Sequence, residues 1–348
     1  MKSRNQVVFV LGVLVLVLIA AMLLACALGA VSIPSLDIVK MSLNRLPLVH
    51  LQATWQPTDE IIIFDIRLMR VVGGAMVGAA LAVAGVLLQG LLRNPMADPY
   101  IIGTSSGAAL GATLAMMLPL GLAFVGLGLV PIGAFCGALV AVLLVYNLAR
   151  VGGKTPVVSM LLAGFVVGAM LTAVMSFLIL TSGTLLLKFH SVYSFLMGSI
   201  SVRDWSQLAV IGPLIVGGIV VASFFAFHLN AFALGEEGAA HLGINVEREK
   251  MLILALASLL TACAVSLSGL IGFVGLVVPH AVRLALGPDH RLLLPASALA
   301  GAAFLVIADT LARTMFAPTE VPVGIFTAVI GAPVFIYLLR RSRREYAF

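Results

Sequence analysis

The chain has 348 residues, of which 62% are apolar and only 10% are charged, and its formal net charge is +6. Soluble domains carry about 25% charged residues, so this composition excludes an ordinary soluble protein and indicates an integral membrane protein. The positive charge does not indicate nucleic-acid binding, because the sequence has no basic patch interleaved with aromatic residues.

Ten apolar runs are long enough for membrane-spanning helices, each of which needs about 20 mostly apolar residues. We therefore expect an all-α integral membrane protein with ten transmembrane helices, in which residues 1–348 form a single transmembrane domain. The predicted spans lie at residues 6–31, 61–91, 98–118, 122–149, 156–181, 205–229, 250–268, 270–286, 292–312 and 322–340.

The first apolar run follows Lys2 and Arg4, as the apolar part of a signal peptide would. It extends from Val7 to Val31, well beyond the length of about 7 to 15 residues that is typical of such a region. This length favours an uncleaved first span. A signal peptide cleaved near the "ACALGA" stretch is the alternative.

An even number of spans places both chain ends on one side of the membrane. Cytoplasmic segments are enriched in lysine and arginine, so the basic residues predict which side this is. With both ends inside, 13 of the 20 basic residues are cytoplasmic. They are Lys2, Arg4, Arg93, Arg150, Lys154, Arg248, Lys250, Arg283, Arg291, Arg340, Arg341, Arg343 and Arg344.

Three arginines fall at the outer ends of spans, where the same rule disfavours them. Arg67 and Arg70 lie in the second span and Arg313 in the ninth, with Asp65 and Asp309 close enough in sequence to neutralise them in part. They either extend to lipid headgroups or bind carboxylates of a docking protein, which arginine forks suit well.

The turn between the second and third spans reads "RNPMADP". Pro95 and Pro99 interrupt the helix, because proline cannot continue it and disfavours helix in the preceding residue. Non-helical backbone at a membrane edge is tolerated where it lines a cavity or contacts protein. We therefore single out Asn94 and Met96.

The sequence lacks the residues of two kinds of reactive site. The stretch "RVGGKTP" resembles a phosphate-binding loop, but that loop needs a glycine at position 148, which is Leu148. The three cysteines have neither metal-site nor disulfide spacing. An ATP-driven process would therefore need a separate ATPase chain, and we expect no metal site.

The segment Leu234–Lys250 holds six of the chain's 34 charged side chains within seventeen residues. It follows the sixth span on the predicted cytoplasmic side. Helical spacing of Glu236, Glu237 and His241 between glycines predicts one or two short helices on the membrane face. The segment is either a solvated loop or a docking surface for a cytoplasmic partner.

These motifs resemble those of the iron-complex and cobalamin permease family, the membrane subunits of type II ATP-binding cassette (ABC) importers. The resemblance runs in consistent order from about residue 60 to 340. It is carried by "RLMR", "GAALAVAG", "RNPMADPYIIGTSSGAALGA", "GEEGAAHLGI", "GLIGFVGLVVPHAVRLALGPDHRLLLP", "ADTLAR" and "EVPVGIFTAVIGAPVFIYLLRR".

The resemblance implies a homodimer of ten-span subunits in the cytoplasmic (inner) membrane, two cytoplasmic ATPase subunits, and a periplasmic or lipid-anchored substrate-binding protein. ATP and Mg would be bound by the ATPase, and this chain would be neither an enzyme nor a cofactor carrier. The cargo would be a bulky metal chelate: a ferric siderophore, haem or cobalamin.

The resemblance also assigns three groups of residues. The coupling helices, at about 234–249, would contact the ATPase through Gly235, Glu236, Glu237, Ala240, His241, Leu242 and Gly243. The cytoplasmic gate would comprise Asn94, Pro95 and Met96, with Val157 and Leu161 in a second layer. The binding protein would dock on Arg67, Arg70 and Arg313.

Two other classes of protein remain as alternatives. A secondary transporter driven by an ion gradient would need paired carboxylates or broken helices at the middle of the membrane, and no acidic residue of this sequence lies in the middle of a predicted span. A receptor or scaffold without transport activity is compatible with the sequence.

Overall fold

A computed structural model describes residues 4–29, 31, 33–45, 51–52, 54–118, 123–124, 127–317 and 319–343. Lys2 and Arg344, which we predict to be cytoplasmic, lie outside these ranges. The elements are α1 (Arg4–Ala27), α2 (Ser35–Asn44), α3 (Pro57–Ile61), the π-helix η1 (Ile62–Arg67), α4 (Leu68–Leu91), α5 (Thr104–Met117), β1 (Ala123–Phe124), β2 (Leu127–Gly128), α6 (Leu129–Ala149), α7 (Val157–Thr181), α8 (Gly183–Leu187), α9 (Phe189–Met197), α10 (Trp205–Phe224), α11 (Ala226–Phe232), α12 (Glu236–His241), α13 (Val246–Ser268), α14 (Val274–Leu286), α15 (His290–Thr314) and α16 (Val323–Arg343).

Seven helices in the described part of the chain are long and apolar enough to cross a membrane. They are α1, the continuous α3–η1–α4 helix, α6, α7, α10, α13 and α15, and each overlaps a predicted span. The other three predicted spans correspond to α5, α14 and α16, of which α5 and α14 have only 14 and 13 residues. The predicted helical membrane fold is therefore confirmed, with one short β-hairpin as the exception, whereas ten full-length spans are not.

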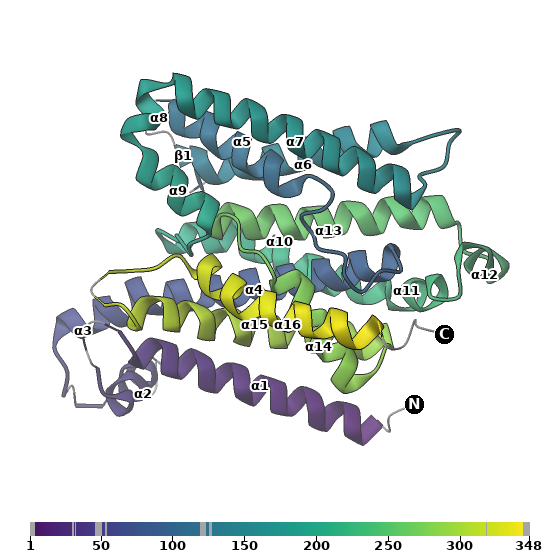
Figure 1. The fold of residues 1–348 in the computed structure, drawn as a ribbon. Coiled ribbons are helices and arrows are strands. Elements are labelled where there is room, and N and C mark those ends of the chain that lie inside the picture. The colour runs from purple at the N-terminus through teal and green to yellow at the C-terminus, as the bar shows by residue number, and fades with distance from the viewer. Residues whose placement is uncertain are drawn as a thin grey trace.

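The core of the bundle is formed by α4, α13 and α15, with α1 on one side and α5, α6 and α7 on the other (Figure 1). In the most apolar 18-residue stretch of each helix, 83% of the residues of the α3–α4 helix and 78% of those of α13 are buried, whereas none of those of α1 are. Small residues permit close contact between these helices: a Cβ at Gly78 of α4 would lie 2.2 Å from the carbonyl oxygen of Gly301 of α15.

Several helix boundaries differ from the sequence prediction, and three of them lie in or beside the predicted gate turn and the charged segment. The third span begins at Thr104 instead of residue 98, because Pro95 and Pro99 keep residues 92–103 in turns and Gly103 adopts a φ of 81°. The sixth begins at Trp205 as predicted but ends at Phe224, where the chain turns into α11. The seventh begins at Val246, so the charged residues 247–250 belong to a long helix.

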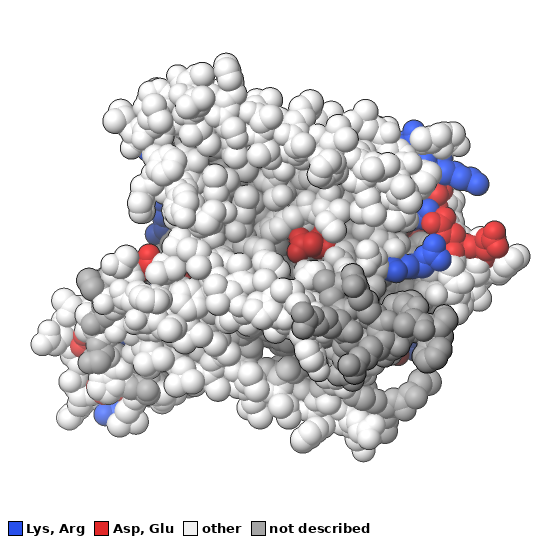
Figure 2. Space-filling model, in the orientation of Figure 1, with Lys and Arg blue, Asp and Glu red and all other residues white. Residues whose placement is uncertain are grey.

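The two ends of the bundle differ. The start of α1 and the end of α16 lie at the end that carries α12, which we call the α12 end, whereas α2, α3, α8, α9 and the β1–β2 hairpin lie at the opposite end (Figure 1). The hairpin is antiparallel and pairs Ala123 with Gly128 and Phe124 with Leu127. Charged side chains gather toward the ends, most densely at the α12 end, and the other prominent charge on this face is an acidic patch near its centre (Figure 2). Away from that patch, the uncharged surface between the ends suits contact with hydrocarbon.

Candidate functional site

The short helix α12 projects from the bundle and offers most of the predicted coupling residues to solvent. Gly235, with a φ of 98°, turns the chain into the helix, and Ala239 packs inward with no exposed surface. Glu236 is held by an ion pair to Lys250 of α13 at 2.8 Å. The exposed predicted residues are Glu237, Ala240, His241, Leu242 and Gly243.

The helix before α12 is clamped to α15. The amide of Asn230 donates to Asp289 at 2.8 Å and its oxygen accepts from the backbone N–H of His290 at 3.0 Å. The bond from Asn230 holds the pKa of the Asp289 carboxyl below its ordinary value, with a smaller contribution from the charge of Arg291. Asp289 therefore stays ionised and caps the start of α15.

The predicted gate turn is exposed at its tip and anchored behind it. Asn94 and Pro95 are exposed and Met96 is half-buried. The Asn94 side-chain oxygen accepts a hydrogen bond from the Met96 N–H at 2.9 Å, and the backbone N–H of Asn94 donates to the Gln89 carbonyl at 3.1 Å. These bonds fix the shape of the turn. The structure thus brings all three predicted residues into one compact loop at the end of α4.

The chain then turns back into the bundle and reaches the segment before α14. The Tyr100 hydroxyl donates to the Ile271 carbonyl at 3.2 Å and accepts from the Ile271 N–H at 3.1 Å. Pro99 lies against Gly275, where a Cβ would meet the proline ring at 2.6 Å. The gate turn is therefore fixed to α14 and to the segment before it, where the Tyr100 partner lies 171 residues further along the chain.

The predicted second layer of the gate lies on the inward side of α7. Val157 and Leu161 are half-buried and pack against the core. Their neighbours Val158 and Leu162 are 68% and 61% exposed, and Phe165 continues the same exposed face. Val158 and Leu162, which are not among the predicted gate residues, are thus the ones that lie on the open surface of α7. The helix is apolar on every side, so its sequence carries no signal of which side faces outward.

Arg67 lies inside the bundle at the end opposite α12. Its side chain is 5% exposed and donates to the carbonyl oxygens of Cys26 at 2.8 Å, Ala27 at 3.1 Å and Val31. It thereby satisfies carbonyl groups at the end of α1 that have no partner within the helix. In this conformation its guanidinium group is not presented to a docking protein.

Arg70 and Arg313 share one buried carboxylate. Arg70 binds both oxygens of Asp309, at 3.0 and 3.1 Å, and also Glu320 at 2.8 Å. Arg313 approaches Asp309 at 3.1 Å, which confirms the predicted i, i+4 pair, and donates to the Ala25 carbonyl at 3.2 Å. The three predicted arginines thus lie near one another, and Glu320 is the exposed member of their network.

The described residues contain no group of three or more histidine, cysteine or acidic side chains placed to hold a metal ion. Cys26 and Cys263 are buried and Cys136 is exposed, all as free thiols. The other candidate features of the described residues are the two predicted gate segments, the projecting helix α12 and the arginine network.

Comparison with known proteins agrees with this reading. The model of the FecCD transport family matches residues 16–341. The cobalamin import system permease protein BtuC of Halobacterium salinarum is 51% identical over 283 residues, which cover 81% of this chain and 74% of that protein. The hemin transport system permease protein HmuU of Yersinia pestis is 40% identical over 346 residues, 99% of each chain.

A solved structure has the same fold. It is described as an inward-facing conformation of a metal-chelate type ABC transporter, and it matches with a TM-score of 0.78 and 29% identity over 96% of this chain and 99% of that chain. The resemblance found in the sequence motifs is confirmed, and the chain belongs to the FecCD transport family.

Proposed function

We propose that this chain is the membrane-spanning permease subunit of an ABC importer that moves a bulky metal chelate into the cytoplasm. The observation that carries the proposal is α12: a short helix whose exposed side bears Glu237 and His241, tied to the bundle through Glu236. Such a helix supplies what a separate ATPase needs, an accessible surface connected directly to the spanning helices. ATP and Mg belong to that ATPase, and this chain holds no cofactor of its own.

The import path would lie between two copies of the chain. Large apolar side chains cover the outer side of α7, and a helix of this kind must face lipid or another protein. In a homodimer the gate would comprise Asn94, Pro95 and Met96 from each copy, with Val158 and Leu162 of α7 above them. The names of the relatives point to cobalamin, haem or a ferric siderophore as cargo.

The orientation follows from the charges. The α12 end would face the cytoplasm with both chain ends, in the inner membrane, and the arginine end would face a periplasmic or lipid-anchored binding protein. Arg70 and Arg313 would bind carboxylates of that protein, whereas Arg67 would support them from inside the bundle. No nucleic acid takes part.

Reconstitution tests the proposal. Vesicles containing the chain, its partner ATPase and its binding protein should take up cobalamin, haem or a ferric siderophore, each offered separately. Omitting either the ATPase or the binding protein should abolish uptake. Uptake that continues at the same rate without the ATPase, or no uptake of any chelate by the full complex, would contradict the proposal.

A further inference from the structure

A chain of polar contacts links α12 to the start of α7, across 80 residues of sequence. Glu236 of α12 binds the Lys250 ammonium group at 2.8 Å, and Lys250 binds Glu247 Oε1 at 3.2 Å. The other oxygen of Glu247 accepts from the backbone N–H of Thr155 at 3.0 Å and from its hydroxyl at 2.8 Å. Glu247 thus uses one oxygen for each side of the connection.

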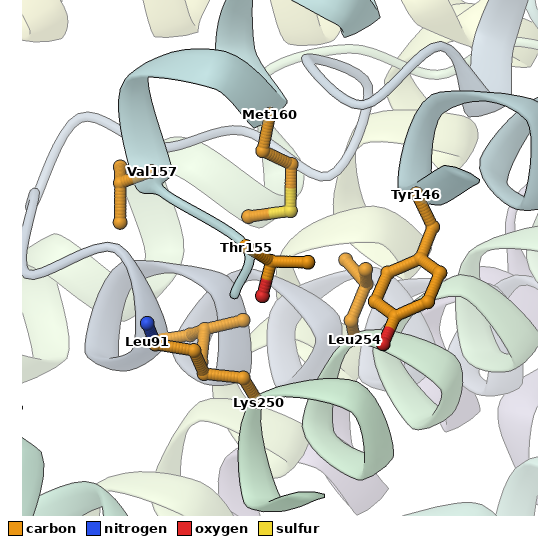
Figure 3. A pocket seen from close by; sticks show the side chains of 7 residues that line it. All are labelled: Leu91, Tyr146, Thr155, Val157, Met160, Lys250 and Leu254. Atoms are coloured by element: carbon orange, nitrogen blue, oxygen red, sulfur yellow. The ribbon is translucent and has the colours of Figure 1, made fainter. Parts of the chain in front are cut away.

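Two of the four residues in this chain of contacts are buried, whereas the Glu236 and Glu247 side chains are 42% and 32% exposed. Lys250 is 7% exposed and Thr155 is 3% exposed. They line a small cleft where α4, α6, α7 and α13 meet, and the Lys250 side chain runs beneath Thr155 toward Leu91 (Figure 3). An ammonium group in apolar surroundings is strongly disfavoured without its carboxylate partners. The contacts therefore resist separation more than exposed ion pairs would.

The segment that carries Thr155 is stiff. Val151 and Lys154 exchange two backbone hydrogen bonds, at 2.9 and 3.1 Å, around Gly152 and Gly153. Both glycines have positive φ, of 58° and 82°, as a tight two-residue hairpin turn requires. This hairpin accounts for the "GGK" stretch that resembles a phosphate-binding loop. Thr155 directly follows the hairpin and precedes Pro156, which is the N-cap residue of α7.

We propose that Glu236, Lys250, Glu247 and Thr155 form a relay that transmits movement of α12 to the gate end of α7. Lys250 and Glu247 are positioning residues: they touch neither cargo nor nucleotide. The relay rests on the proposed function, because the ATPase is what moves α12. Directional bonds suit this task, since apolar side chains can slide past one another, whereas carboxylates paired with a buried ammonium group stay in register with it.

The test uses the full complex with its ATPase and binding protein in vesicles, and it records ATP hydrolysis and uptake together. In Lys250→Gln and Glu247→Gln, hydrolysis should continue while the uptake per ATP hydrolysed falls about tenfold, a usual strength of coupling between two sites. Thr155→Val, which removes only the hydroxyl contact, should show a smaller loss. Lys154→Gln is the matched control, because it removes the same charge from an exposed neighbour and should leave the ratio unchanged.

A double variant separates a relay from independent effects. Glu236→Gln combined with Lys250→Gln should be no worse than Lys250→Gln alone, because both cut the same connection. The relay would be overturned if the losses of uptake per ATP in the two single variants multiplied in the double variant. It would also be overturned if the variants lost thermal stability but kept the normal uptake per ATP. In both cases the proposed function would stand. Absence of ATP-driven uptake in the unmodified complex would instead overturn the proposed function and the relay with it.

Discussion

Gln89 is a polar side chain inside the apolar contact between α4 and α14. Its amide nitrogen lies 3.3 Å from the Gly275 carbonyl, 3.2 Å from the Leu276 carbonyl and 3.5 Å from the Ala97 carbonyl. Pro279 lacks an N–H group, so the Gly275 carbonyl four residues earlier has no partner in its own helix. Gln89 supplies that partner and joins α4 to α14 beside the gate turn.

Replacing Gln89 tests this role. Gln89→Leu should lower the free energy of unfolding by about 1–3 kcal/mol, because a buried carbonyl is left without a donor. Adding Pro279→Ala should restore part of the loss, since residue 279 then has an N–H group for the Gly275 carbonyl. Thermal unfolding of the four proteins in detergent measures both effects. Additive losses would show that Gln89 does not serve this carbonyl.

The arginine network makes a prediction about docking. Arg70→Gln should weaken binding-protein affinity by about 2–5 kcal/mol, because it removes one partner of a largely buried charge contact. Glu320→Gln should strengthen docking, because Glu320 competes for the same guanidinium group. Affinity of the reconstituted complex at two salt concentrations provides the measurement. Unchanged affinity in both variants would show that Arg70 only stabilises the bundle and does not contact the binding protein.

At the scale of elements, α12 is a small helix with one side packed on the bundle and the other side exposed. It has only six residues, its inner side is held by Ala239 and Glu236, and its outer side is free. A helix this short has little stability of its own, so its contacts with α11 and α13 keep it in place.

Bulky side chains on the outer surface of α12 should prevent the ATPase from binding to the permease. In a variant with Glu237→Trp and His241→Trp, co-purification with the ATPase and ATP-driven uptake should fall about tenfold or more, because tryptophan does not fit a surface shaped for smaller groups. Thermal unfolding of the permease itself should stay unchanged. Leu148→Trp, on an exposed position of α6, serves as the control. Normal co-purification of the double variant would exclude α12 as the contact.

Most of the elements could be predicted from the sequence, because hydropathy and proline positions determine spans almost locally. The exceptions have physical causes. The α7 face could not be assigned, because an all-apolar helix has no polar side to set its rotation. The relay could not be predicted, because Thr155 and Glu247 are 92 residues apart and only the packing of α7 on α6, and of α6 on α13, brings them together. Likewise, the burial of Arg67 depends on the position of α1.

At the scale of the whole molecule, the proposed path requires two copies with their gate segments facing each other. In a background in which Cys26, Cys136 and Cys263 are replaced, Met96→Cys and Val158→Cys should cross-link between copies in one nucleotide state and not in another. Val157→Cys, which faces inward, should not cross-link. Gel shifts after oxidation report the result. Cross-linking that is the same in every state would make these segments structural and not gates.

A comparison of uptake driven by ATP with uptake driven by an ion gradient tests the central claim most directly. Vesicles containing the chain, its ATPase and its binding protein should accumulate the chelate when ATP is enclosed with the ATPase and ionophores collapse every ion gradient. The same vesicles without ATP should take up none when a proton or sodium gradient is imposed. Accumulation driven by a gradient in the absence of ATP would contradict the account and identify a secondary transporter instead.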